Sequence, residues 1–540
     1  MSTTGAAALG AARLRQLFWA ASAATLGFRV WLAWWLPFTG DEAYFVLWAR
    51  QPDWSFYDHP PVAGWLLAAL LSVSQAKLVL RLPAVLLPTI LAIGIAWLVA
   101  TLARDRRSPA SRSDAEALGF ATALAWLLVP AQVLNVATTT DTPLLYLAFG
   151  SLAAFALGVR RGSAWLFAVA GAALGLAFLS KYFAVLLGFG YLVFTLLVRR
   201  PGRWRELAVV LAAAAPFVAV NIAWNYEHCW TNVLFNVFNR HGDAGFAWYR
   251  PLLFAALAVY VSSPLLVWQL ARGGPAVRAA AADPAVASIA VCALAPLAVF
   301  AALSAVKDIG LHWLLSLTPA LFMTGAFALG AAQLLASAKF LAGFAALHVV
   351  AVLALAAVPL EALQRFKQYD SIVLAARTGE LLAALQPYEG KFTFAADSYS
   401  PAATLGYHDA VLGLTAQPGA TEAWRRHHFL VFGRAAVHGR HDDILTDFRQ
   451  LAGKDILVLR RDEADPKRYA PYFRSVEVRD VTVAGATFRL ILGEGFDYPA
   501  YRDRVLAEIR ARYYRIPAYL PQGRCYFCER YFGTRTCPAP

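Results

Sequence analysis

Residues 38–65 gather side chains that could perform acid–base chemistry. Four of the 13 acidic residues of positions 1–360 fall within 18 consecutive positions here, among many aromatic residues. A carboxylate at the edge of a membrane is costly unless it is paired or used, and partial loss of water makes it a better base. We expect catalytic groups here, the alternative being a solvated loop with helix-capping aspartates. The groups are Asp41, Glu42, Asp53, Asp58 and His59.

Further polar groups lie between other apolar segments. Acidic groups close to cations suit a lipid-linked phosphate substrate, because cations bind the phosphate, a carboxylate activates the acceptor and aromatic rings contact sugars. Two of the residues have simpler alternatives: Asp141 in TTTDTP could cap a helix, and Lys181 in LSKY could extend toward water. These candidates are Arg81, Asp141, Lys181, Arg240, Lys307 and His312, with Tyr44 and Tyr57 as aromatic neighbours.

The charge of the chain is unevenly distributed. The 540 residues have a mean hydropathy of +0.52 and are 59% hydrophobic. Charged residues number 36 in positions 1–360 but 46 in the shorter 361–540, whereas soluble proteins carry about 25% charged residues. The first part therefore cannot be a water-soluble domain, and the second has ordinary soluble composition. Disorder, a fibrous protein and a disulfide scaffold are excluded.

The apolar part predicts a bundle of membrane helices. A spanning helix needs about 20 apolar residues, and eleven segments qualify, within a range of about 9 to 13. Residues 60–75 are apolar but short and fit a helix on the membrane surface. Arg29, halfway along the first span, needs a partner or a water-filled cavity. The predicted spans are 16–37, 82–103, 117–136, 142–159, 163–180, 182–198, 206–224, 251–270, 286–306, 313–335 and 340–359.

The connections alternate in charge. Arg-rich connections such as 104–112 alternate with acidic, aromatic and His-bearing ones at 38–80, 135–141, 225–250 and 305–312. The positive-inside rule places the Arg-rich set in the cytoplasm and the candidate residues outside. The net charge of +14 thus indicates topology rather than a nucleic-acid partner. The first apolar run is longer than that of a cleaved signal peptide and predicts a membrane helix.

The C-terminal third predicts a small layered α/β domain. β-Branched and apolar stretches at 391–396, 428–433, 455–461 and 481–492 alternate with helix-like stretches at 372–386, 442–452 and 500–514. We therefore expect a multi-span α-helical membrane domain at 1–360, with its first outer loop at 38–80. An extracytoplasmic α/β domain follows at 361–540.

Three cysteines lie close together near the C-terminus, in CYFCERYFGTRTC. A CxxC pair is typical of zinc or redox sites, but no fourth zinc ligand is visible nearby. Since disulfides persist outside the cytoplasm, a disulfide between two of the three is the first expectation. The residues are Cys525, Cys528 and Cys537.

Several motifs together resemble the GT-C membrane glycosyltransferases, specifically the bacterial relatives of protein O-mannosyltransferases and of the lipid A aminoarabinose transferase. The resemblance covers about residues 1–335. It implies a sugar donor on polyprenyl phosphate, an inverting reaction and a site in an outward cavity. The motifs are DEAY (41–44), YDHPP (57–61), TTTDTPL (138–144), LSKY (179–182), a WN…R pattern across 224–240 and KDIGLHW (307–313).

The resemblance also implies roles. Asp41 matches a general base, and Glu42 matches the neighbour that positions the acceptor or orients the base. Lys181 and Arg240 match cations that hold the donor phosphate, and Asp141 matches an acidic residue of the site. Lys307 and His312 are added to this set of residues that bind the donor phosphate. The remaining cavity residues are Tyr44, Tyr57, Asp58, His59 and Arg81.

A zinc ion has been associated with the cavity of the aminoarabinose transferase. Phe235 and Asn236 stand here where the corresponding His is expected. We therefore predict no zinc, and Asp58, His59 and Asp141 are the residues that leave room for a divalent ion. No other cofactor is expected.

The sequence thus favours an inverting glycosyltransferase of a bacterial inner membrane, acting as a monomer. Its donor is a polyprenyl-phosphate-linked sugar, and its acceptor a lipid A, glycan, lipid or protein. One alternative is a transporter or flippase, in which intramembrane charges mark an ion path. Another is a non-catalytic assembly protein, which predicts that residues 38–60 tolerate loss of their carboxylates. The sugar, the acceptor and the carrier length stay open.

Overall fold

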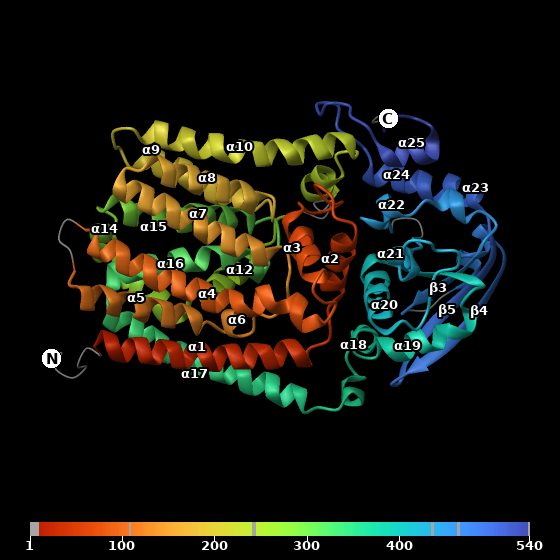
Figure 1. Cartoon of the computed structure of the whole chain (residues 1–540), viewed down its shortest axis with the longest axis horizontal. Coiled ribbons are helices and arrows are strands. Elements are labelled where there is room, and N and C mark those ends of the chain that lie inside the picture. Colours follow the sequence, from red (N-terminus) through yellow and green to blue (C-terminus); the bar gives the residue numbers. More distant parts are fainter. Residues whose placement is uncertain (1–9, 107–109, 240–244, 434–436, 462–464, 538–540) are drawn as a thin grey trace. The chain divides into compact units, whose positions relative to one another are not determined.

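The computed structural model describes residues 10–106, 110–239, 245–433, 437–461 and 465–537. The chain forms two compact units, whose elements are labelled in Figure 1. We call the first the helical unit: Met1–Trp35, Arg81–Ala219 and Asp243–Leu355. The second is the mixed unit: Leu36–Leu80, Val220–Gly242 and Ala356–Pro540. The mixed unit therefore groups the segment that carries Asp41 and Asp58 with the C-terminal region.

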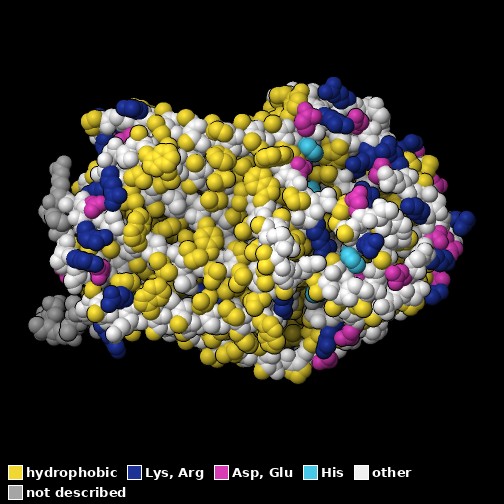
Figure 2. Space-filling view, viewed as in Figure 1, with side chains coloured by type: hydrophobic (Ala, Val, Ile, Leu, Met, Phe, Trp, Pro, Cys, Tyr) yellow, Lys and Arg dark blue, Asp and Glu magenta, His cyan; other side chains and the backbone are white. Residues whose placement is uncertain are grey.

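Among the described residues, six helices are long and apolar enough to cross a membrane, or seven if one bent pair counts as a single span. Apolar side chains cover the visible flank of the helical unit, and Lys and Arg gather at one of its ends (Figure 2). These features indicate a membrane protein. The six spans are α4 (Lys77–Arg104), α7 (Asp141–Arg161), α10 (Arg203–Glu227), α15 (Pro284–Leu303), residues Leu311–Leu329, which comprise a 3₁₀ turn and α16 (Thr318–Leu329), and α17 (Ala331–Ala356).

The other predicted spans are shorter, less apolar or broken. The predicted span at 251–270 is wrong as a continuous helix, because α12 (Tyr249–Ser262) and α13 (Pro264–Arg272) meet at a bend of 98°. Ser263 has a φ of 79° there, and Pro264 lacks the N–H that would continue the helix. The remaining helices of this unit are α1 (Ala11–Trp35), α5 (Arg112–Leu127), α6 (Pro130–Val133), α8 (Ala164–Phe178), α9 (Ala184–Leu197) and α14 (Gly274–Ala280).

The charge within the first apolar segment has partners on its neighbours. Arg29 is completely buried; its Nε donates to the Val85 carbonyl at 2.9 Å and its Nη2 to the Thr89 hydroxyl at 2.7 Å. Pro88 lacks the N–H that would bond the Ala84 carbonyl, and the Asn135 amide donates to that carbonyl at 2.9 Å. Backbone carbonyls and the Thr89 hydroxyl therefore accept from the buried guanidinium, and a side-chain amide satisfies the interrupted backbone of α4.

The mixed unit contains a five-stranded sheet in the order β2-β1-β3-β5-β4. The first three strands are parallel, and the long hairpin of β4 and β5 runs antiparallel to β3. Each of the four predicted strand stretches contains a strand, and the last continues a hairpin that begins eight residues earlier. The strands are β1 (Phe392–Ala396), β2 (Leu430–Val431), β3 (Asp455–Arg460), β4 (Phe473–Val483) and β5 (Ala486–Phe496).

Short helices surround this sheet. Helix α20, which the sequence did not predict, packs against both β1 and α2. The segment expected as a surface helix at 60–75 contains α3. The helices are α2 (Gly40–Arg50), α3 (Val62–Leu71), α11 (Thr231–Val233), α18 (Tyr369–Ala376), α19 (Thr378–Leu385), α20 (Tyr399–Leu412), α21 (Ala423–Arg426), α22 (Asp442–Leu445), α23 (Tyr498–Tyr501), α24 (Ala507–Tyr513) and α25 (Tyr526–Phe532).

Two disulfides join parts of the mixed unit. Cys528 pairs with Cys537, so the expected disulfide among the three C-terminal cysteines is present. Cys525 pairs instead with Cys229, which lies 296 positions earlier. No feature of the sequence predicts that second pairing. Cys292 is free and buried.

Candidate functional site

The carboxylate of Asp41 lies at the start of α2, in a turn that its neighbours fix. The Thr39 hydroxyl accepts from the Glu42 N–H at 3.2 Å, and the Glu42 carboxylate accepts from the Thr39 N–H at 3.1 Å. This reciprocal pair is a capping box, which holds the first helical turn. Glu42 is buried, whereas Asp41 is exposed. Glu42 thus sets the turn that presents Asp41.

Asp58 lies in a buried polar contact formed by three elements. Its Oδ1 accepts from the Tyr44 hydroxyl at 3.2 Å, and its Oδ2 accepts from the Arg440 guanidinium at 3.2 Å. Its side chain is 1% exposed. Burial raises the pKa of Asp58 to about 6, and the Arg440 charge and the Tyr44 hydrogen bond oppose that rise. Burial also raises the pKa of Tyr44 well above its usual value, so this hydroxyl stays a donor.

Tyr57 and His59 flank this carboxylate. Tyr57 is completely buried, with ring centroids 5.3 Å from His438 and 6.2 Å from Tyr514. His59 is half-buried, and its ring centroid lies 5.8 Å from that of Trp48. The structure therefore brings together four of the predicted cavity residues of the first segment, although Tyr57 belongs to an aromatic core.

An array of asparagine amides holds the backbone of this segment. Asn232 donates to the Phe56 carbonyl at 2.8 Å, and Asn236 donates to the Asp58 carbonyl at 2.8 Å. The Ser55 hydroxyl accepts from both Asn221 and Asn232 at 3.3 Å. These residues were not among those predicted from the sequence. Their signal is the i, i+4 spacing of amides on one helix face: Asn221 and Asn225, then Asn232 and Asn236.

A second carboxylate–cation pair lies within the helical unit. The Lys181 ammonium contacts both oxygens of Asp141, at 2.7 and 2.8 Å. Asp141 is the first residue of α7, and Lys181 lies in the turn between α8 and α9. Both side chains are largely buried. The Asp141 carboxylate thus forms an ion pair, and the alternative of a lysine extended into water does not describe this geometry.

Three further predicted residues of the helical unit, Arg81, Lys307 and His312, have neighbours of their own. Arg81 is completely buried and donates to the Ala33 carbonyl at 2.8 Å. Lys307 follows α15, and the ring of His312 lies beside that of Trp313, with centroids 6.2 Å apart. Next to Lys307, Asp308 pairs with Arg250 at 3.1 Å. Arg240 lies outside the described residues.

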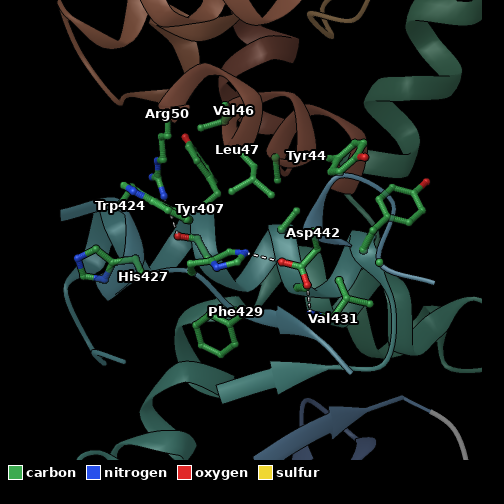
Figure 3. A pocket seen from close by; sticks show the side chains of 17 residues that line it. Tyr44, Val46, Leu47, Arg50, Tyr407, Trp424, His427, Phe429, Val431 and Asp442 are labelled. Carbon is green, nitrogen blue, oxygen red and sulfur yellow. Dashed lines mark hydrogen bonds and ion pairs between the residues drawn. The ribbon is translucent and has the colours of Figure 1, made fainter. Parts of the chain in front are cut away.

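Behind α2, a small pocket lies between this helix, α20 and β2 (Figure 3). Its polar centre is Asp442, which is 2.7 Å from the His428 imidazole and accepts from the Val431 N–H at 2.8 Å. Arg50 and Tyr407 enter from the two helices. Both Asp442 oxygens are thus engaged within the mixed unit.

The residues present do not fit a metal ion at the first segment. Asp58 is already engaged by Tyr44 and Arg440. Within the described ranges, one group of three or more metal-ligating side chains lies within 4.8 Å, and each of its three cysteines is half of a disulfide.

Comparisons with known proteins give related results. A family model described as dolichyl-phosphate-mannose-protein mannosyltransferase matches residues 58–224. The lipid A galacturonosyltransferase RgtD of Rhizobium johnstonii is 28% identical over 254 residues, which are 45% of this chain and 52% of RgtD. The chain thus spans about half the length of the curated relative that it matches.

Two crystal structures of ArnT from Cupriavidus metallidurans are similar along nearly their whole length. One is bound to undecaprenyl phosphate and the other is in the apo state. Both are 17% identical to this chain and cover 87% of it and 96% of ArnT, with TM-scores of 0.56 and 0.53. The expected GT-C fold is therefore confirmed.

Proposed function

We propose that this chain, which shares the fold of ArnT, is an inverting glycosyltransferase that moves a sugar from a polyprenyl-phosphate carrier to lipid A or a related envelope glycolipid. The similarity to RgtD supports this acceptor class, and the undecaprenyl phosphate bound to ArnT supports the carrier. The proposed location is a bacterial inner membrane, with the N-terminus in the cytoplasm and the mixed unit outside. The basic connections support this orientation.

The exposed carboxylate of Asp41 is the observation that carries the proposal. It lies at the second position of a capped helix and accepts one hydrogen bond, from the Tyr399 hydroxyl at 3.1 Å. A fixed and accessible carboxylate suits a group that accepts the proton of an acceptor hydroxyl. Asp58, buried and paired with Arg440, is less suited to that role.

The proposed reaction is a single displacement. Asp41 takes the proton from the acceptor hydroxyl, whose oxygen attacks the anomeric carbon. The bond from that carbon to the phosphate oxygen breaks, and polyprenyl phosphate leaves from the opposite face. One displacement inverts the anomeric centre and needs no second nucleophilic carboxylate.

Lys181 is the proposed ligand of the donor phosphate in the helical unit. An ammonium has three N–H donors, and Asp141 accepts two of them. A cation near the phosphate stabilises the charge that develops as the carrier leaves. The family resemblance gives the same role to Arg240, Lys307 and His312.

The first test replaces Asp41 with Asn, which keeps an acceptor for Tyr399 but cannot take a proton. With undecaprenyl-phosphate-linked galacturonic acid or aminoarabinose and lipid A, we expect transfer to fall on the order of 10³-fold, within the range seen when catalytic acids or bases are removed. Asp480→Asn, on the exposed surface of β4, is the matched control and should keep wild-type turnover.

Mass spectrometry of envelope lipids identifies the acceptor in cells. A strain that lacks the chain should lose one sugar from a specific lipid, and D41N should not restore it. Wild-type turnover by purified D41N would reject the role of Asp41. Solute uptake or efflux in proteoliposomes without sugar transfer would instead favour a transporter.

A further inference from the structure

Two residues of the C-terminal region contact the carboxylates of the first segment, and all of them belong to the mixed unit. Arg440 pairs with Asp58 at 3.2 Å, and its guanidinium carbon lies 3.9 Å from the centroid of the Tyr399 ring. Tyr399 in turn donates to Asp41 at 3.1 Å. A continuous set of contacts thus runs from Asp58 through Arg440 and Tyr399 to Asp41.

The backbone at Arg440 adopts a conformation that is uncommon for arginine. Its φ is 56°, in the left-handed region that glycine and asparagine adopt readily but arginine does not. Such a conformation is strained for a residue with a side chain and persists where the surroundings over-determine it. Here the surroundings are the Asp58 carboxylate, the Tyr399 ring and the Phe235 ring, whose centroid lies 5.0 Å away. The side chain of Arg440 therefore has a defined place that its backbone alone would not favour.

The charges of the cluster formed by Asp41, Asp58, Tyr399 and Arg440 disfavour the binding of a substrate anion. Two carboxylates, Asp41 and Asp58, face one guanidinium, so the cluster has an excess negative charge. The pKa of the adjacent His438 is lowered to about 3, chiefly by burial and then by Arg440, and the imidazole adds no charge near neutral pH. The titratable groups around Arg440 and Asp58 are Asp41, Tyr44, Tyr57, Tyr399 and His438. Arg440 is thus matched to carboxylates of its own chain.

We propose that Arg440 and Tyr399 are positioning residues that hold the carboxylates of Asp41 and Asp58 in their reactive arrangement. The C-terminal region then forms part of the catalytic machinery rather than only limiting which acceptor approaches. This inference rests on the proposed sugar transfer and adds to it the source of Asp41's orientation. A planar guanidinium suits this role because it can pair with a carboxylate edge-on while its face stacks on an aromatic ring.

The test compares four variants of the full-length chain in lipid nanodiscs. R440N removes the cation but suits the left-handed backbone, R440K keeps a charge without the planar fork, and Y399F removes one hydrogen bond. R449N is the control, because it breaks an exposed arginine–aspartate pair of the same unit. With undecaprenyl-phosphate-linked galacturonic acid or aminoarabinose as donor, we expect kcat to fall on the order of 10²-fold in R440N and about 10-fold in Y399F. R440K should recover part of the loss, and the KM for the donor should change less than about threefold.

A double-mutant cycle separates positioning from general damage. If Arg440 acts through Asp58, R440N/D58N should be no slower than D58N alone. Wild-type kcat in R440N, equal losses in R440N and R449N, or fully additive losses in the double variant would each overturn the inference.

Hydrogen exchange provides a readout that does not depend on sugar transfer. R440N should speed amide exchange in residues 38–46 and 55–59, while β3 and β5 exchange as in the wild type. Unchanged exchange in the first segment overturns the inference even if the enzyme is active. A wild-type chain that transfers sugar from neither donor contradicts the proposed function instead, and the exchange result still decides the role of Arg440.

Discussion

The Asp141–Lys181 pair of the helical unit and the Asp58–Arg440 pair of the mixed unit are built differently. In the helical unit, the Lys181 ammonium lies within 2.8 Å of both Asp141 oxygens. In the mixed unit, Arg440 donates a hydrogen bond to one oxygen of Asp58, and the Tyr44 hydroxyl donates to the other. A compact, flexible ammonium can move between partners, whereas a guanidinium stacked on a ring keeps one geometry.

This difference suggests two kinds of task. A lysine that shares its donors between Asp141 and a passing phosphate can bind and release a charged substrate without leaving Asp141 unpaired. An arginine fixed against Asp58 and the Tyr399 ring suits a framework that does not change during the reaction.

The largest effect is expected at Lys181. K181M removes the proposed phosphate ligand and should lower kcat/KM for undecaprenyl-phosphate-linked sugar on the order of 10³-fold, whereas K181R should lose about tenfold. Because K181M leaves a buried carboxylate unpaired, the double variant D141N/K181M serves as the folding control. It should fold as the wild type does and remain inactive. Recovery of activity in the double variant would show that pairing Asp141, rather than binding phosphate, is the task of Lys181.

An intermediate effect is expected from pH, through the pair in the mixed unit. The pKa of Asp58 in the folded chain is about 6, above its ordinary value of 3.8, chiefly because of burial. As pH falls through about 6, Asp58 takes up a proton and its ion pair with Arg440 weakens, so turnover should fall by up to about tenfold per unit.

The stability of the fold should change in the opposite direction. A carboxyl group with a raised folded pKa contributes stability that is fully present below about 3.8 and is lost as pH rises through about 6. Asp58 then adds at most about 3 kcal/mol to the free energy of unfolding on acidification. Burial also raises the pKa of Asp443, to about 7, and this group affects stability in the same direction. The measurement is therefore the difference in the free energy of unfolding between the wild type and D58N. A difference that does not vary between pH 4 and pH 7 would contradict the raised pKa of Asp58.

The two pairs also differ in how far the sequence could predict them. Asp141 and Lys181 lie in an apolar part of the sequence in which charged residues are rare, so each charged residue there is a candidate for a functional role. Arg440 lies 382 positions from Asp58, and Tyr399 lies 358 positions from Asp41. Arg440 and Tyr399 occur in a region of ordinary charge density, where one more polar or charged residue is not conspicuous in the sequence. Their partners are set by tertiary packing alone.

Composition likewise predicted where apolar helices occur better than it predicted whether each helix is continuous. The segment at 251–270 is apolar throughout, but Pro264 follows a serine in the left-handed region and the helix turns by 98°. A hydropathy window cannot detect such a bend. The asparagines of the amide array, at positions 221, 225, 232 and 236, are spaced four, seven and four residues apart, which the sequence shows. Their target, the backbone of residues 55–58, was visible only in the fold.

The smallest effect on activity is expected from the Cys229–Cys525 disulfide. This bond joins the segment that carries the amide array to the C-terminal region, as Arg440 does for the first segment, but it does so covalently and outside the carboxylate cluster. Asn232 and Asn236 donate to the carbonyls of residues 56 and 58 without involving the disulfide, and we expect these hydrogen bonds to persist when it is removed. In C229S/C525S we therefore expect kcat to change less than about threefold, while the free energy of unfolding falls by about 2–4 kcal/mol. C528S/C537S, which opens a nine-residue separation, is the matched control and should lose less stability, because a short loop restricts the unfolded chain less. A loss of activity in C229S/C525S as large as that in R440N would show that the covalent link, and not the guanidinium, holds the first segment in place.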